Sequence, residues 1–283
     1  MPGRIVDTHI HVWDFEKAEY PWLNGNTSIL NRTFQLDELD AEAGEVGITA
    51  GLLVQAANNP EDTQNMLEVA RKTEWIKGVV GWLPLTNPAE TEKVLKENYS
   101  KEKYFKGVRH LIHDEADPKW LLKEEVLESL EVLSSYDLPY DVVGVLPQHI
   151  ETTLVVAERI PSLKLVLDHL NQPPIATREK FGRWGDMMKE ASKLKNIHAK
   201  ISGLGTTSKK REWTEADVLP YVEFVLEAFG QGRCFCGGDW PVSLLAGSYS
   251  RTWKIYTSVI DSLLKKEQRN NVYYANAVAF YKL

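Results

Sequence analysis

Cysteine is nearly absent from the sequence, which contains only Cys234 and Cys236 in its 283 residues. Residues two apart on a strand point to the same face, and a disulfide between such close neighbours would be strained. The sequence holds no second cysteine cluster that could complete a metal site with this pair. Two buried thiols are typical of a reducing compartment. We therefore expect two free cysteines that bind no metal.

The sequence also lacks a basic excess and long apolar runs. Its formal net charge is −7, whereas nucleic-acid-binding proteins usually carry a positive excess. No stretch reaches the ~20 apolar residues of a membrane-spanning helix, and no apolar signal segment precedes the first predicted strand. We expect a cytoplasmic protein that binds neither nucleic acid nor membranes. Both a monomer and a homo-oligomer are compatible with the sequence.

A glycine-rich phosphate-binding turn is missing after the first predicted strand, where Val12-Trp13-Asp14-Phe15 stands instead. A doubly wound open sheet would place such a turn there, so this alternative is less favoured. What the chain has is a regular alternation of β-branched runs and amphipathic stretches. The predicted strands are 5–11, 50–55, 77–83, 105–111, 139–143, 163–169, 198–202 and 233–238, and the predicted helices are 61–73, 88–98, 119–135, 147–159, 178–194, 215–229, 251–265 and 267–283. The pattern predicts an α/β protein with one domain over residues 1–283, a (β/α)8 TIM barrel.

Four long irregular stretches each follow a predicted strand. They cover 14–34, 171–177, 203–213 and 241–250. In a barrel they gather at the C-terminal face, where active sites sit, and long loops in a compact domain are usually binding elements or lids. We expect the functional site at this face.

Polar residues stand at the carboxyl end of the predicted strands and would form one ring in a barrel. Charged groups are rarely buried without partners, so their convergence on one mouth indicates a site in use. The ring comprises His9, His11, Gln55, Trp82, Arg109, His110, Asp141, Asp168, His169, Lys200, Ser202 and Asp239. His113 and His149 fall outside this ring, and His198 lies deeper on its strand and is expected to be structural.

His9 and His11 share one face of the first strand, so they can hold a metal ion or a carbonyl oxygen between them. The alternative is one core histidine and one at the loop edge. Asp239 follows two glycines, which allow another group to approach the backbone closely. An N-cap is the alternative for Asp239, but the residues after Pro241 do not open a clear helix. His169 ends an apolar strand beside Asp168, which suits a site.

Arg109 and His110 are adjacent, so only one of them faces the barrel lumen, and the sequence does not decide which. The planar guanidinium of Arg109 is suited to binding substrate oxygens. Tryptophans beside a polar pocket suit stacking on the apolar face of a sugar ring. The predicted substrate-binding residues are Arg109, His110, Lys200, Gln55, Trp13, Trp22 and Trp82.

Several segments together resemble the amidohydrolase superfamily. More narrowly, they are similar to its branch of sugar-lactone hydrolases, which includes L-fuconolactonase and L-rhamnonolactonase. The matching segments are Ile5-Val6-Asp7-Thr8-His9-Ile10-His11, Tyr20-Pro21-Trp22-Leu23, Val108-Arg109-His110, Val166-Leu167-Asp168-His169, Ile201-Ser202-Gly203-Leu204, Gly238-Asp239-Trp240-Pro241 and the closing residues 274–281.

The resemblance implies a (β/α)8 barrel hydrolase in which Asp239 is the base that activates water. His9, His11 and His169 would surround the reacting carbonyl. The two-metal members carry a bridging Lys or Glu on strand four and a His on strand five. This chain has Arg109 and His110 on strand four and Asp141 on strand five. At most one divalent ion is therefore expected.

Zinc is the divalent ion that the resemblance implies, held by His9, His11 and Asp239. Some members of the branch work without a metal, and both versions stay open. The lactonases commonly carry Gly-Lys-Pro after the Asp-His pair, whereas this chain has Asn171-Gln172-Pro173, which bears on the substrate more than on the chemistry.

The function predicted on this basis is hydrolysis of a small lactone, a deoxy-sugar aldonolactone, by base-activated attack of water on the ester carbonyl. Two alternatives belong to other classes. One is a metal-dependent decarboxylase of the same superfamily, acting on an aromatic or dienoic acid. The other is a non-catalytic binder of sugar acids.

Overall fold

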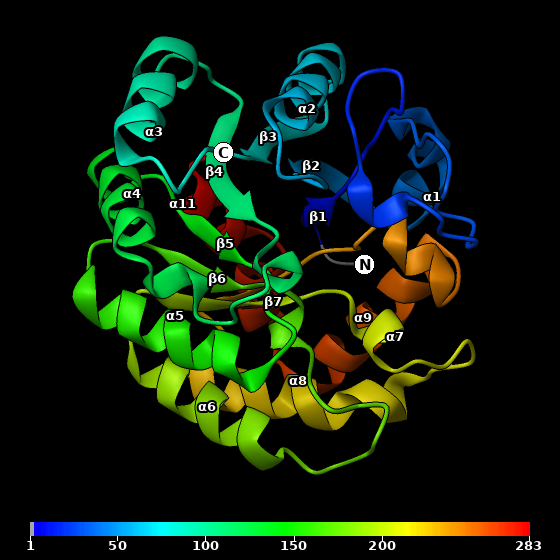
Figure 1. Ribbon diagram of the computed structural model, residues 1–283. Helices are drawn as coiled ribbons and strands as arrows, with labels where there is room; N and C mark the ends of the chain where they lie inside the picture. The colour runs from blue at the N-terminus through cyan, green and yellow to red at the C-terminus, as the bar shows by residue number, and fades with distance from the viewer. Residues whose placement is uncertain (1–2) are drawn as a thin grey trace.

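A computed structural model describes residues 3–283 and shows the predicted barrel. Eight parallel strands pair in chain order, and helices surround them (Figure 1). The strands are β1 (Ile5–Ile10), β2 (Ile48–Val54), β3 (Ile76–Gly81), β4 (Phe105–His110), β5 (Tyr140–Val142), β6 (Leu165–Leu167), β7 (Ile197–Ile201) and β8 (Cys234–Cys236). Both cysteines of β8 are buried free thiols.

The last strand closes the barrel against the first just beyond its own end. The backbone N–H of His11 donates to the carbonyl of Trp240, and that of Asp239 donates to the carbonyl of His9, both at 2.7 Å. This approach requires glycine at position 237, where a Cβ atom would lie 2.4 Å from the Cβ of His9. Closure therefore places Asp239 directly beside the histidines of β1.

The helices begin at the signals that the sequence carries. Asn59 and Asn87 cap α2 and α3 by accepting the backbone N–H groups of Asp62 and Glu90, and each is followed by proline at the first helical position. The helices are α1 (Asp40–Glu45), α2 (Pro60–Lys72), α3 (Pro88–Val94), α4 (Glu124–Ser135), α5 (Pro147–Arg159), α6 (Gly182–Lys193), α7 (Leu204–Thr207), α8 (Glu215–Phe229), α9 (Tyr249–Leu263), α10 (Lys266–Asn270) and α11 (Asn276–Tyr281).

Four predicted helices differ in extent. The helix predicted over 88–98 ends at Val94, where a π turn, Leu95–Tyr99, follows. The helix predicted over 119–135 begins at Glu124, because Lys123 is extended with ψ 137° and a separate 3-10 turn precedes it. The helix predicted over 178–194 begins at Gly182, because Phe181 has a φ of 71°. The segment predicted as one helix over 267–283 is α10 and α11 joined by a π turn, Asn271–Ala275. The short helices α1 and α7 were not predicted.

The C-terminal helix α11 lies behind the strands in the view of Figure 1. Phe280 and Tyr281 pack there with barrel residues such as Val6 and Phe235 in an apolar cluster. This packing fills the barrel interior from that side. Within residues 3–283, no helix is both long and apolar enough to cross a bilayer.

Candidate active site

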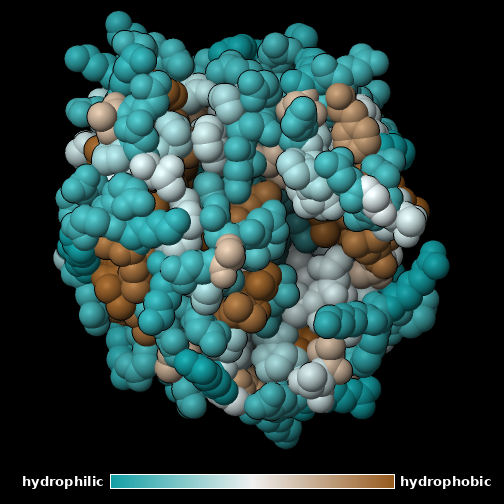
Figure 2. All heavy atoms as spheres, viewed as in Figure 1, coloured by the Kyte–Doolittle hydropathy of each residue, from teal (hydrophilic) through white to brown (hydrophobic). Residues whose placement is uncertain are grey.

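A pocket of about 230 Å³ is formed by residues that follow the strands at the carboxyl end of the barrel. The molecular face in Figure 2 is largely hydrophilic, with hydrophobic residues gathered in recesses. The pocket is lined by His11, Trp13, Trp22, Ala56, Arg109, Leu111, His113, Val143, Val145, His169, Gln172, Gly203, Thr206, Thr207, Asp239 and Val242. Each of the four long loops contributes to this lining, as the sequence predicted.

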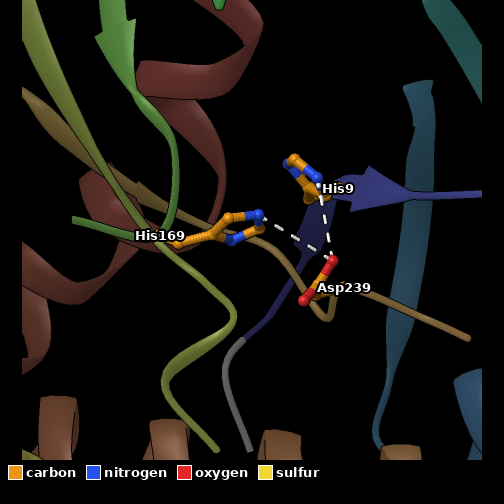
Figure 3. Close-up of side chains that lie close together, drawn as sticks. All are labelled: His9, His169 and Asp239. Carbon is orange, nitrogen blue, oxygen red and sulfur yellow. Dashed lines mark ion pairs between the residues drawn. The ribbon is translucent and has the colours of Figure 1, made fainter. Parts of the chain in front are cut away.

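The carboxylate of Asp239 lies against three imidazoles. Its Oδ1 atom is 3.5 Å from Nε2 of His11, 3.8 Å from Nε2 of His9 and 4.0 Å from Nε2 of His169. Figure 3 shows His9, on β1, and His169, on the turn after β6, pointing toward this oxygen. Oδ1 is buried, yet no residue of the described chain hydrogen-bonds to it. A buried acceptor without a partner costs about 1–3 kcal/mol, and a bound ligand is one explanation for such an atom.

The hydrogen bond of His11 shows which of its two ring nitrogens carries the proton. Its Nδ1 donates to the carbonyl of Val54 at 2.7 Å, so the neutral ring presents an unprotonated Nε2 to the carboxylate. Burial lowers the pKa of His11 and holds that of His9 well below its ordinary value. Two acceptors that face each other at this distance need a proton or a cation between them.

The donor set fits one divalent ion. Ligand atoms of His9, His169 and Asp239 all lie within 4.8 Å of one another. Imidazole nitrogens with one carboxylate oxygen are a ligand set found around zinc, at about 2.0–2.2 Å each. The sequence predicted His9, His11 and Asp239 as ligands. The structure adds His169 to this group and keeps His11 beside the same oxygen.

His169 stands on a strained turn. All four residues His169–Gln172 have φ between 50° and 54°, a left-handed conformation that costs about 1–2 kcal/mol for each non-glycine residue. The turn is held in place by Trp184, whose Nε1 donates to the carbonyl of Leu170 at 2.7 Å, and by Ser202. The Oγ atom of Ser202 accepts the backbone N–H of His169 at 3.2 Å and lies 2.8 Å from its Nδ1. Such strain is concentrated at functional sites.

Beneath the histidines lies a buried network of four charges. Nζ of Lys200 is 2.6 Å from Oδ2 of Asp141 and 2.8 Å from Oδ1 of Asp168, and Nη1 of Arg109 is 3.1 Å from Oδ2 of Asp168. Tyr281 also donates to Asp141 at 2.8 Å. Burial opposes the ionisation of Asp168, but Lys200, His9 and Arg109 together hold its pKa well below the usual range. Two cations and two carboxylates thus cancel inside the barrel.

Arg109, and not His110, is the strand-four residue that faces the lumen. Its Nε donates to Oε1 of Gln55 at 3.1 Å, and its Nη2 donates to the Gln55 carbonyl. Its Nη1 lies 3.2 Å from Nε2 of His9, so the guanidinium touches the histidine cluster directly. Gln55 therefore positions Arg109 and is itself outside the pocket lining.

His110 points away from the lumen and belongs to an aromatic cluster. Its ring stacks on Trp120 at 4.1 Å between centroids. Nε1 of Trp82 donates to its Nδ1 at 3.1 Å, and its Nε2 lies 2.8 Å from Glu115. Because indole is only a donor, Nδ1 accepts and Nε2 carries the proton. His110 and Trp82 hold the loops after β3 and β4 together.

Among the predicted substrate-binding residues, Arg109, Trp13 and Trp22 line the pocket. His110, Lys200, Gln55 and Trp82 do not, which corrects the expectation that they contact substrate. Their side chains are committed to protein partners in the contacts described above.

His113 corrects a second expectation, since the sequence placed it outside the ring. It lies on a 3-10 turn, Ile112–Asp114, and this turn after β4 brings it to the pocket. Gln172, Thr206 and Thr207 were also missed. His113 and Gln172 stand on turns and the two threonines on the short helix α7, where strand alternation gives no signal. Only the loops that carry Gln172 and the threonines were predicted to belong to the site.

The sequence model of the amidohydrolase family matches residues 6–283. An L-fucono-1,5-lactonase from Burkholderia ambifaria is 32% identical, over 98% of this chain and 95% of its own length. An L-fucono-1,5-lactonase from Burkholderia multivorans is 30% identical, over 100% of this chain and 97% of its own. The crystal structure of a Burkholderia multivorans amidohydrolase with bound zinc superposes with a TM-score of 0.89 at 29% identity, covering 99% of this chain and 100% of the other.

Proposed function

Because the chain belongs to the amidohydrolase family, we propose that it hydrolyses a small lactone, a deoxy-sugar aldonolactone of the L-fucono-1,5-lactone kind. The family is hydrolytic, and both L-fucono-1,5-lactonases match over nearly their whole length. One observation carries the proposal: the buried, unpartnered Oδ1 of Asp239 faces three imidazole nitrogens in the pocket.

In the proposed reaction, Asp239 removes a proton from water as the water oxygen bonds to the lactone carbonyl carbon. A positioned general base contributes about 10²–10⁴-fold to the rate. The carbonyl oxygen gains negative charge at this step. Arg109, which lines the pocket, provides positive charge beside it, and a well-placed donor is worth about 3–4 kcal/mol. The bond from the carbonyl carbon to the ring oxygen then breaks, which leaves a hydroxy acid.

His9, His169 and Asp239, with His11 beside them, would hold one divalent ion, for which zinc is our proposal. Such an ion polarises a carbonyl oxygen and lowers the pKa of bound water. Asp168 orients His9, because its Oδ1 lies 3.6 Å from Nδ1 of that ring, and Ser202 orients His169 through Nδ1 in the same way. The protein thus fixes its donor atoms through neighbouring hydrogen bonds.

The pocket lining supports a deoxy-sugar substrate. Leu111, Val143 and Val145 provide apolar wall, while Gln172 and Thr207 provide polar groups in the same pocket. A deoxy-sugar lactone has the same mixed character, since it carries a methyl group and several hydroxyls. Burying the methyl group against the apolar wall gains about 0.8 kcal/mol or more.

A panel of L- and D-aldonolactones, followed by a pH indicator, tests the proposal. We expect proton release with L-fucono-1,5-lactone and close stereochemical relatives, and none above background with Asp239→Asn. Carbon dioxide release from aromatic acids, without lactone opening, would instead identify a decarboxylase. Sugar-acid binding without any turnover would identify a binding protein.

Metal content is tested separately on folded protein treated with a chelator. We expect one ion per chain before treatment, loss of activity afterwards and recovery on addition of zinc. Circular dichroism before and after treatment controls for unfolding. Full activity of the folded, metal-free protein would contradict the zinc proposal and leave Arg109 as the source of positive charge beside the carbonyl oxygen.

A further inference from the structure

Lactone opening creates a second proton requirement beyond the one that Asp239 meets. When the bond to the ring oxygen breaks, that oxygen leaves as an alkoxide, which is a strong base and a poor leaving group. A proton delivered as the bond breaks removes this barrier. The donor must line the pocket, exchange protons with solvent and have an N–H or O–H that no protein acceptor occupies.

The imidazoles of the Asp239 cluster do not meet this requirement. Nδ1 of His11 donates to the carbonyl of Val54, and Nδ1 of His169 lies 2.8 Å from Oγ of Ser202. The Nε2 atoms of both rings face Asp239. Each ring is thus held at Nδ1 by a protein partner and turned at Nε2 toward Asp239.

The remaining polar groups of the lining are also excluded. The hydroxyls of Thr206 and Thr207 both donate to the carbonyl of Gly203, at 2.8 and 2.9 Å. The indole N–H of Trp22 donates to a backbone carbonyl, and the guanidinium of Arg109 does not give up a proton in proteins. The amide of Gln172 is not an acid.

His113 has the required properties. It lines the pocket, and about 30% of its side chain is exposed, so it can exchange protons with solvent. Its Nε2 is 3.5 Å from Oδ1 of Asp114, and its Nδ1 has no hydrogen-bond partner among residues 3–283. Burial lowers its pKa, Asp114 opposes this, and Arg109, His169 and His149 add to the lowering. The result is a stronger acid than an isolated imidazolium.

We propose that His113 is the general acid that protonates the ring oxygen of the departing alkoxide. This rests on the proposed lactone hydrolysis. The carbon–oxygen bond breaks, its electron pair goes to the ring oxygen, and that oxygen takes the proton from His113, which becomes neutral. The proton that Asp239 took from water and the acidic proton of the product pass to solvent, and solvent reprotonates His113. One proton is released per turnover once the product acid has ionised.

The test compares two substrates that differ in one atom, the aldonolactone and its thiolactone with sulfur at the ring position. Both carry the same hydroxyls. The thiolactone releases a thiolate, whose conjugate acid has a pKa of about 8.5 in cysteine, so it leaves without a proton donor. For His113→Gln we expect kcat/KM to fall by about 10²–10³-fold on the lactone and by less than about fivefold on the thiolactone.

His198→Gln is the matched control, because His198 lies on β7 against Phe235 and Phe280 and is absent from the pocket lining. It should leave both rates unchanged. Thermal unfolding of each variant checks its folding, and the solvent deuterium isotope effect on the wild-type enzyme gives a reading that needs no variant. That isotope effect should be larger on the lactone than on the thiolactone.

Equal losses on both substrates would overturn the inference and make His113 a binding residue for substrate hydroxyls. No loss on either would also overturn it, and would mean that the proton on Asp239 returns to the ring oxygen. A wild-type protein that opens neither substrate would contradict the proposed function itself, which is a distinguishable outcome.

Discussion

Two groups of buried charges lie side by side in this barrel, and they are built in opposite ways. In the network of Lys200, Arg109, Asp141 and Asp168, every charge has an oppositely charged partner. The Asp239 cluster begins only 3.4 Å from Lys200, at the ring of His9. Oδ1 of Asp168 and Oδ1 of Asp239 both lack a hydrogen bond, but Nζ of Lys200 lies 2.8 Å from the former, whereas no lysine or arginine among residues 3–283 lies within 4.0 Å of Asp239.

The backbone conformation also differs between these two groups. Lys200, Arg109 and Asp141 lie within regular strands, whereas Asp239 and His169 have φ angles of 58° and 54°. A network in which every charge is paired stabilises the barrel and holds the side chains above it in position. A carboxylate without a cationic partner, on strained backbone, is what a site for ligand binding and chemistry requires. We infer that stability and activity are separable by mutation between the two groups.

Asp239→Asn should produce the largest effect on activity. We expect kcat to fall by about 10²–10⁴-fold, because the base is lost. The free energy of unfolding should change by less than about 1 kcal/mol, since Oδ1 gives up no hydrogen bond. Proton-release kinetics and urea unfolding measure the two quantities. A large loss of stability would show that the cluster also holds the fold together.

Lys200→Met should produce the largest effect on stability. It leaves Asp141 and Asp168 buried without their shared cation, and breaking a buried ion pair costs about 3–5 kcal/mol. The double variant that adds Asp141→Asn should recover part of this loss, because one uncompensated carboxylate is then removed. Chemical denaturation checks both. A loss below about 1 kcal/mol for the single variant would contradict the assigned role of the network.

Asp62 is a third kind of buried carboxylate, with hydrogen bonds but no cation within bonding distance. It accepts the N–H groups of Ala56 and Ala57 and the hydroxyl of Tyr20. Burial raises its pKa to about 6, in contrast to Asp168. The folded state therefore binds a proton more tightly than the unfolded state, so this group's contribution to stability falls as pH rises from about 4 to 6, by about 3 kcal/mol.

Asp62→Asn imitates the protonated carboxyl, since its amide can donate to the hydroxyl of Tyr20. We expect the variant to gain stability relative to wild type as pH rises through this window, and to match it most closely near pH 4. Urea unfolding at several pH values measures the difference. Parallel pH profiles would show that Asp62 keeps an ordinary pKa in the fold.

Gly203→Ala should have a modest effect on stability and a specific effect on the site. Position 203 has a φ of 61°, and a Cβ there would lie 2.6 Å from Nδ1 of His169. Gly47 is the control, with a φ of 79° and open space around it. Both alanine variants should lose about 1–2 kcal/mol of stability from backbone strain, but only Gly203→Ala should lose activity. Equal activity in the two variants would show that His169 tolerates displacement.

The sequence predicted the barrel well because its signals repeat: eight apolar runs at βα spacing, and helices that begin at Asn-Pro and similar caps. The prediction was wrong where a single residue interrupts a periodic pattern. The apolar period of α4 continues upstream through Leu121 and Leu122, but Lys123 is extended, so the helix begins later. No periodicity reports such a single-residue interruption.

The sequence predicted which residues belong to the site better than it predicted how deep in the barrel each residue lies. Strand alternation brought Asp239 and the histidines of β1 to one mouth, but it did not distinguish a lumen residue at the surface from one beneath it. Lys200 shares a face with the site and lies under His9, paired with two carboxylates. His113 stands outside any strand, so only the folded turn brings it to the pocket.

The segment between β1 and α1 is clamped at its base. Trp13 and Phe34 pair through two backbone hydrogen bonds, at 3.2 and 2.9 Å, and Nε1 of Trp13 donates to the carbonyl of Arg32. Trp22, from inside this segment, reaches the pocket and donates to the carbonyl of Ala56 at 2.7 Å. Because the ends of the loop are already held together, changing its length costs little closure entropy. The length of this segment, and with it the position of Trp22 in the pocket, can therefore change at little cost to the barrel and its buried charges.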